Sequence, residues 1–168
     1  MPGNEKHTYI EDEIVQLLKD IYRHAMINSA LCAELGLDAA VVSLMKRIPY
    51  FTDSSTSKYV EFFEYSRAIV YLEDEEVQGG RDPDLFEVQE PRLDHLLPWE
   101  IALICTGDEG KNVILDTREN TIRVEDFLYG PPGRDAPADY EYSLERTNEK
   151  RHYRNYYAHH ASTWLAEW

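Results

Sequence analysis

Residues 96–127 read LLPWEIALICTGDEGKNVILDTRENTIRVEDF, and this stretch decides the fold. It contains three short runs of strand-forming residues, Trp99–Cys105, Asn112–Asp116 and Thr121–Glu125. Two polar turns separate them: the first contains two glycines, which readily adopt the positive φ of a hairpin, and the second contains an asparagine that tolerates it. The stretch therefore predicts an antiparallel β-meander of three or more strands. We expect the rest of the chain to cover one face of it.

Helical patterns flank the meander on both sides. Apolar residues recur there every three or four positions, and Ser29 and Asp38 are suited to cap two of the helices. The expected helices are Glu11–Ile27, a short helix from Ser29 to Gly36, Ala39–Arg47, Lys58–Leu72 with a core face of Phe62, Phe63, Ile69 and Val70, and Ala158–Trp168. Together these elements predict an α+β fold in which the meander packs against N-terminal helices and a C-terminal helix.

Length and composition indicate one globular domain. At 168 residues, 43% of them hydrophobic, the chain is long enough to bury about 70% of its unfolded surface, so we expect a single domain over residues 1–168 with a flexible tail at 1–10. The longest apolar run, Ile101–Cys105, is far shorter than the roughly 20 residues that span a bilayer. Because the N-terminus also lacks a secretory signal pattern, we expect a cytoplasmic or nuclear protein. Cys32 and Cys105 lie in apolar segments, which predicts buried free thiols.

The charge balance narrows the class of partner. The chain has 32 acidic and 17 basic residues and a net charge of −15. A field of this sign repels phosphate backbones and anionic lipids, so we expect no nucleic-acid and no membrane partner. It favours a protein partner that is basic or polar, although the same excess of acid would also keep a cytosolic protein in solution without any partner.

The sequence contains no recognisable catalytic or metal-binding motif. The patterns HExxH, CxxC and GxSxG are absent. His159 and His160, together with His152, are possible metal ligands, but adjacent histidines point about 100° apart on the predicted helix and do not easily bind one metal. No metal and no cofactor are therefore expected. Among the carboxylates, Asp116 at a strand end is the best candidate for acid–base chemistry, but an aspartate there more often caps the following turn.

Tyrosine and arginine are concentrated between residues 129 and 157, and these residue types dominate protein contact sites. This segment, the sheet edge and an acidic loop at 73–84 together predict a contact surface. Its candidate residues are Trp99, Tyr129, Tyr140, Tyr142, Tyr153, Arg154, Glu75 and Glu76. We interpret the chain as a non-catalytic, acidic protein-interaction module.

A second interpretation is a small-molecule-binding protein or enzyme. In it the Pro- and Gly-rich loop 130–137 is a mobile lid over a pocket with aromatic walls and a few converging polar groups. The walls are Trp99, Tyr129 and Tyr140, and the polar pair is drawn from Asp116, His95 and His152.

Short motifs give the chain a resemblance to a known superfamily. In order they are Arg47-Ile48-Pro49-Tyr50, Tyr71-Leu72, a strand opening with Pro98-Trp99, and Ile114-Leu115-Asp116-Thr117. In their order and spacing the chain resembles the SUKH (SMI1/KNR4-like) superfamily, in particular its filamentous-fungal branch. The resemblance implies an α+β fold with a helix-flanked antiparallel sheet. It also implies a binding rather than a catalytic role, because bacterial members are toxin-neutralising immunity proteins and the fungal type member is a regulatory interaction protein.

The resemblance assigns no functional residue to this chain. The acidic Gly-Gly stretch of the typical bacterial members is not recognisable here. The C-terminal segment rich in tyrosine and histidine also has no counterpart in the family pattern.

Overall fold

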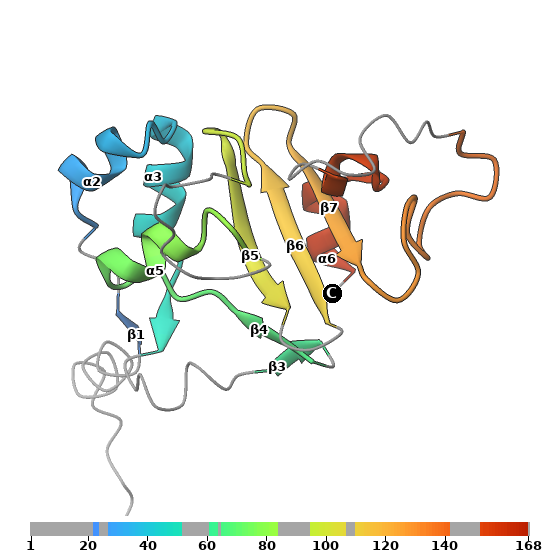
Figure 1. Cartoon of the computed structure of the whole chain (residues 1–168), viewed down its shortest axis with the longest axis horizontal. Coiled ribbons are helices and arrows are strands. Elements are labelled where there is room, and N and C mark those ends of the chain that lie inside the picture. Colours follow the sequence, from blue (N-terminus) through green and yellow to red (C-terminus); the bar gives the residue numbers. More distant parts are fainter. Residues whose placement is uncertain are drawn as a thin grey trace, which may run out of the picture.

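The computed structural model describes residues 22–23, 27–51, 61–63, 65–83, 95–106, 110–141 and 152–167. Its centre is a six-stranded antiparallel sheet with the strand order β3-β4-β5-β6-β7-β8 (Figure 1). The strands are β3 Glu61–Phe63, β4 Ser66–Ala68, β5 Glu100–Thr106, β6 Lys111–Asp116, β7 Thr121–Asp126 and β8 Ala158–His160. Strands β5, β6 and β7 are the predicted meander, so the meander and the α+β class are confirmed.

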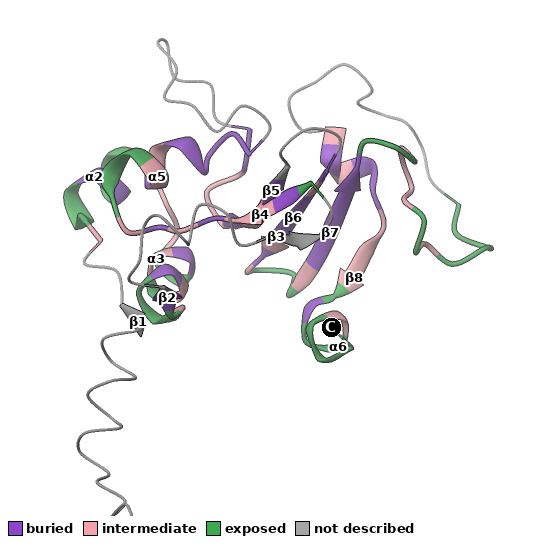
Figure 2. Cartoon of the chain, turned by 90° about the horizontal axis from the view of Figure 1, so that it is seen from below, coloured by how far each residue is buried: buried purple, intermediate pink, exposed green. Residues whose placement is uncertain are grey.

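Short helices pack around the sheet. Within the described residues they are α2 Ser29–Glu34, α3 Ala39–Arg47, α5 Asp74–Gly79, α6 Ala161–Ala166 and the 3₁₀ helix η1 His152–Asn155. Helices α2, α3 and α5 gather at one end of the molecule, whereas α6 lies beside β7 and β8 (Figures 1 and 2). In this part of the chain no helix has both the length and the apolar character needed to cross a bilayer.

Side-chain caps fix the starts of α2 and α3. Asp38 Oδ1 accepts a hydrogen bond from the amide of Ala40 at 3.1 Å, and α3 has its predicted bounds. The cap of α2 is Asn28 rather than Ser29, because the Asn28 side-chain oxygen accepts from the amides of Ala30 and Leu31. Both caps satisfy amides that the first turn of a helix leaves without partners.

Apolar side chains are buried on both faces of the sheet, rather than on the one face that we expected. One cluster joins the sheet to the helices at the α2–α3–α5 end, and a second joins it to α6. All residues of β6 and β7 are buried or half-buried, without the exposed alternate positions of a half-covered strand. The first cluster includes Val41, Met45, Tyr71, Ile101, Ile114 and Tyr153, and the second Ile104, Val113, Ile122, Val124 and Ala161.

The predicted helix Lys58–Leu72 is wrong, because strands β3 and β4 form a hairpin within it. This segment is rich in aromatic and β-branched side chains, which favour a strand when they pack on a neighbouring strand, and β4 pairs with β5. Gly110 permits this close approach, since a Cβ atom there would lie 2.2 Å from the carbonyl oxygen of Tyr65. In the expected core face, Ile69 is buried and Val70 is half-buried, and the other two side chains lie outside the described residues.

The N-terminal helix predicted for Glu11–Ile27 is wrong at Tyr22–Arg23. These two residues form strand β1, which pairs with strand β2, Tyr50–Phe51, in a separate two-stranded sheet. Residues 11–21 and 24–26 of the predicted helix lie outside the described residues, as does the predicted tail at 1–10.

The C-terminal helix begins later than predicted. Residues 158–160 form β8 on the edge of β7, and α6 starts at Ala161. Pairing along β7 occupies backbone groups that an open sheet edge would expose. His159 and His160 therefore lie on a strand, not on a helix.

The acidic loop predicted at 73–84 contains helix α5. The carboxylate of Glu76 accepts hydrogen bonds from the amides of Leu72 and Glu73, at 3.0 and 3.1 Å, and so stabilises the start of the helix. Gly80 marks close packing, because a Cβ atom there would lie 2.5 Å from the Tyr71 ring. The acidic run is thus the exposed first turn of a helix whose far end is buried.

Candidate functional site

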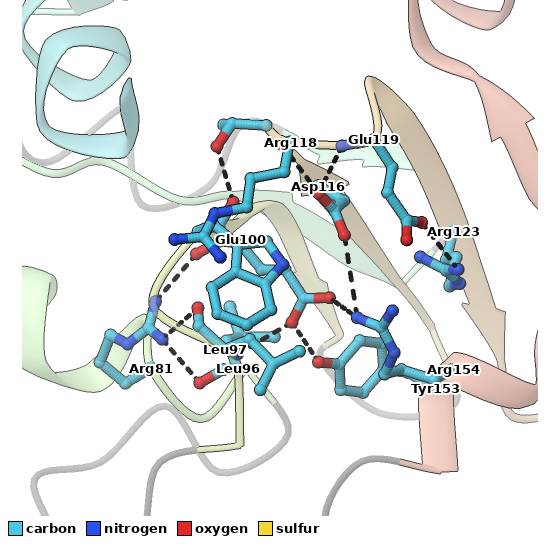
Figure 3. Close-up of polar contacts among 12 residues, drawn as sticks. Arg81, Leu96, Leu97, Glu100, Asp116, Arg118, Glu119, Arg123, Tyr153 and Arg154 are labelled. Atoms are coloured by element: carbon cyan, nitrogen blue, oxygen red, sulfur yellow. Dashed lines mark hydrogen bonds and ion pairs between the residues drawn. The ribbon is translucent and has the colours of Figure 1, made fainter. Parts of the chain in front are cut away.

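A polar network lies where the C-terminal segment crosses the sheet (Figure 3). The register of the strands builds its base: Glu100 at the start of β5 is opposite Asp116 at the end of β6, and Asp116 is opposite Thr121 at the start of β7. Both carboxylates are almost fully buried, with 0% and 1% of their surface exposed. Buried charges of this kind require hydrogen-bonding partners.

Glu100 is the centre of the network. Its carboxylate accepts a hydrogen bond from the amide of Leu97 at 2.8 Å, one from the hydroxyl of Tyr153, and one from the guanidinium of Arg154. Burial, with the adjacent Glu100 carboxylate as a further cause, raises the pKa of Tyr153 above its usual value, so its hydroxyl remains a donor. Two consecutive residues of η1 are thereby attached to the first residue of β5.

Asp116 caps the turn that follows β6. Its Oδ1 atom accepts hydrogen bonds from the amides of Arg118 and Glu119, both at 2.9 Å, as the strand-end position predicted. Its Oδ2 atom lies 3.8 Å from Nη1 of Arg154. Arg154 therefore lies between two buried carboxylates, and Asp116 stabilises the fold in two ways.

Arg81 holds the segment that leads into β5. Its buried guanidinium donates to the carbonyl oxygens of Leu96, Leu97 and Glu100 at 2.7, 2.8 and 2.9 Å. A planar guanidinium with five donors suits such a set of acceptors. This residue was not predicted, because the acidic composition of the surrounding segment is typical of a solvated loop.

A third buried carboxylate, Glu125 on β7, attaches the start of η1. Asn112, its partner in the register, donates to Oε2 at 2.8 Å, and Nε2 of His152 lies 2.6 Å from Oε1. The ring of His95 lies between the two halves of the network, with its centroid 6.1 Å from that of His152 and 5.1 Å from that of Tyr153. Ring contacts of His95 thus link His152, which lies beside Glu125, to Tyr153, which donates to Glu100, whereas Asp116 is linked to this group through Arg154.

The aromatic residues predicted to wall a pocket are not assembled around this network. Trp99 lies beside it and is covered by the guanidinium of Arg118, 3.9 Å from the ring centroid. Tyr129 follows the far end of β7, so the register places it at the opposite end of the strands from Trp99. Tyr140 packs edge-on against Tyr157, with 4.9 Å between the ring centroids.

The loop 130–137 lies at the far end of β7, not over Asp116. The amide of Tyr157 donates to the carbonyl oxygen of Pro132 at 2.9 Å, which attaches the loop to the C-terminal segment. Of the other predicted contact residues, Tyr153 is buried, Arg154 is largely covered and Glu76 stabilises α5, whereas Glu75 is exposed. Tyr142 lies outside the described residues.

The sequence contained a signal for the buried carboxylates. Side chains two apart on a strand share a face, so Asn112 and Asp116 lie on one face of β6, and Glu125 faces Asn112 from β7. Such a polar row within an apolar meander needs a polar cover, and His152, Tyr153 and Arg154 supply it. The row was visible in the sequence, but nothing there indicated which segment covers it.

The described residues contain no group of three metal-ligating side chains. Both cysteines are buried free thiols, as predicted, and burial raises the pKa of each, which disfavours the reactive thiolate.

The role of Asp116 can be tested by two substitutions. We expect Asp116→Ala to lower the free energy of unfolding by about 1–2 kcal/mol, because the turn amides lose their acceptor. Asp116→Asn keeps an acceptor oxygen, so the loss should be clearly smaller. Urea denaturation of the two variants and the wild type measures this order, and equal losses for both variants would contradict the capping role.

Comparisons of the chain with protein-family models, with curated proteins and with solved structures found no match.

Proposed function

We propose that this chain is a non-catalytic, acidic protein-interaction module of the SUKH (SMI1/KNR4-like) type, which binds a basic or polar protein partner in the cytoplasm or nucleus. The observation that carries the proposal is the excess of exposed acidic side chains over exposed basic ones among the described residues. Acids and bases are both buried in the fold, but at the surface of the described residues the exposed acids outnumber the exposed bases.

Several basic side chains are buried or paired with buried acids, and few remain exposed. Arg81 and Arg123 are buried, Arg154 pairs with Glu100, and Lys111 pairs with Asp126 at 3.2 Å. Among the described residues, the exposed bases are Lys46, Arg47, Arg118 and Arg134. The exposed acids, which outnumber them, are Glu34, Glu73, Asp74, Glu75, Glu119, Asp135, Asp139, Glu141 and Glu167.

The described surface therefore has the same negative sign as the net charge of the chain. Exposed charges act over a Debye length of about 8 Å at physiological salt, so a basic partner is attracted and a nucleic acid or anionic membrane is repelled. The network around Glu100 also supports a binding role over a catalytic one, because its carboxylates are engaged in holding η1 and the turn after β6.

A capture experiment tests the proposal. The full chain is immobilised, incubated with extract, crosslinked at low and at high salt, and compared with an unrelated bait of the same net charge. We expect specific retention of one or a few basic proteins, lost at high salt and absent from the control bait. Retention of no specific protein, together with a small molecule that raises the melting temperature, would contradict the proposal.

A further inference from the structure

We propose that the loop 127–141 is the surface that receives the partner, and that the partner contributes a lysine- or arginine-rich segment carrying an aliphatic or aromatic side chain. This inference rests on the proposed function and specifies its contact surface. It starts from exposed apolar side chains. Phe127, Leu128 and Tyr129 follow one another directly and are all exposed, Leu128 to 65% and Tyr129 to 58%.

Three consecutive exposed apolar residues are unusual unless they have a function. Tyr140, at the other end of the loop, is exposed as well. The other large hydrophobic residues exposed in the described part of the chain, Tyr65 and Leu165, are not part of such a run. Contiguous apolar patches with a polar rim are typical of protein contact sites.

The loop is held in a defined shape. The amide of Leu128 donates to Oδ1 of Asp126 at 3.0 Å, and the amide of Gly130 donates to the carbonyl oxygen of the same residue at 2.9 Å. Asp126 is itself buried and paired with Lys111. A partner that binds a loop already ordered in this way loses little conformational entropy, which favours affinity.

The charges on the loop determine the chemistry of the occupant. Asp135, Asp139 and Glu141 are exposed, and the guanidinium of Arg134 lies 5.5 Å from the ring centroid of Tyr129. The three acids outnumber the one base on this loop, so exposed acids and exposed apolar side chains on the same loop match a segment that combines basic and apolar side chains. A second copy of this chain is a poor occupant, because both copies carry a net charge of −15.

Most of the other exposed acids among the described residues lie at another end of the molecule. Glu34, Glu73, Asp74 and Glu75 belong to the α2–α5 end, and the loop 127–141 extends from the opposite end of the molecule (Figures 1 and 2). Figure 2 shows the long exposed stretch of this loop beyond β7. The acidic helix α5 and the loop 127–141 therefore lie at opposite ends of the described part of the chain.

Two synthetic peptides test the inference by nuclear magnetic resonance titration of the isotope-labelled full chain. One peptide alternates lysine with leucine, and the other has the same lysines with serine in place of leucine. We expect the lysine–leucine peptide to shift the amide signals of 127–141. We also expect it to bind at least tenfold more weakly to Leu128→Asp than to the wild type, whereas the lysine–serine peptide binds the wild type weakly.

Leu165→Asp is the matched control, because Leu165 is also exposed, at 46%, and lies on α6. It should bind the lysine–leucine peptide like the wild type, and both variants should keep the wild-type melting temperature. Shifts centred on α2 and α5, or equal affinity of Leu128→Asp, would overturn the assignment of this surface while leaving a basic partner in place. If neither peptide binds, the proposal of a basic partner is itself overturned. If light scattering shows that the wild type is a dimer and that Leu128→Asp is a monomer, the occupant of the loop is a second copy of the chain.

Discussion

Replacing Glu100 by alanine should lower the free energy of unfolding by about 3–5 kcal/mol, the range observed when one partner is removed from a buried ion pair. Glu100 is fully buried and accepts hydrogen bonds from Leu97, Tyr153 and Arg154. Without this carboxylate the Tyr153 hydroxyl has no acceptor, and Asp116 is the remaining carboxylate beside Arg154. Urea denaturation at neutral pH measures the effect.

Two further variants show how much other side chains contribute to the free energy of unfolding in comparison with Glu100. Tyr153→Phe removes one donor but leaves Glu100 paired, so the expected loss is about 1–2 kcal/mol. Glu75→Ala removes an exposed carboxylate and should change the free energy of unfolding by less than about 0.5 kcal/mol. If Glu100→Ala were as stable as Glu75→Ala, the network would not be what attaches η1 to the sheet.

High pH should destabilise the fold through three buried tyrosines. Hydroxyls of Tyr50 and Tyr71 donate to the carbonyl oxygens of Met45 and Ala102, at 3.1 and 2.7 Å, and that of Tyr153 donates to Glu100. Burial is the main cause that raises the pKa of all three above the usual value of about 10. The folded state therefore keeps three protons that the unfolded state releases above this pH.

The sign of the effect follows from this difference in bound protons. The stabilisation is fully present below about pH 10 and is lost as the pH rises towards the folded-state pKa values. Each tyrosine lowers the free energy of unfolding by about 1.4 kcal/mol per pH unit in that window, so the three together contribute roughly 4 kcal/mol per unit.

Tyrosinate absorbance and circular dichroism, followed together against pH, measure this effect. We expect the last tyrosines to ionise only as the secondary structure is lost. We also expect Tyr71→Phe to reduce the slope of the free energy of unfolding against pH by the contribution of one proton. Ionisation of all tyrosines near pH 10 in a chain that keeps its circular dichroism would contradict the burial of these hydroxyls.

Local patterns in the sequence predicted the elements that local chemistry determines. The meander, the bounds of α3 and the turn cap of Asp116 depend on alternation, caps and turn residues that lie close together in the chain. The segment Lys58–Leu72 was misassigned because its aromatic spacing suits a helix, whereas its conformation is decided by pairing with β5, some forty residues away. A tertiary contact of this kind overrides local preference.

The candidate site was predicted only in part, for a related reason. Tyrosine and arginine are useful both at an interface and as internal anchors, because they combine large area with hydrogen bonding. Composition therefore grouped Tyr129 with Tyr153 and Arg154. The structure separates them: the first is exposed on the loop 127–141, and the other two are anchored on Glu100.

Site-specific photo-crosslinking tests the central claim most directly, namely that the loop 127–141 contacts the partner. A benzophenone side chain is placed at position 128 in one full-length protein and at position 165 in another, and each is irradiated with the basic protein retained by the wild type. We expect a crosslinked product from position 128 and none from position 165. Equal crosslinking at both positions, or crosslinking at position 165 alone, would contradict the account.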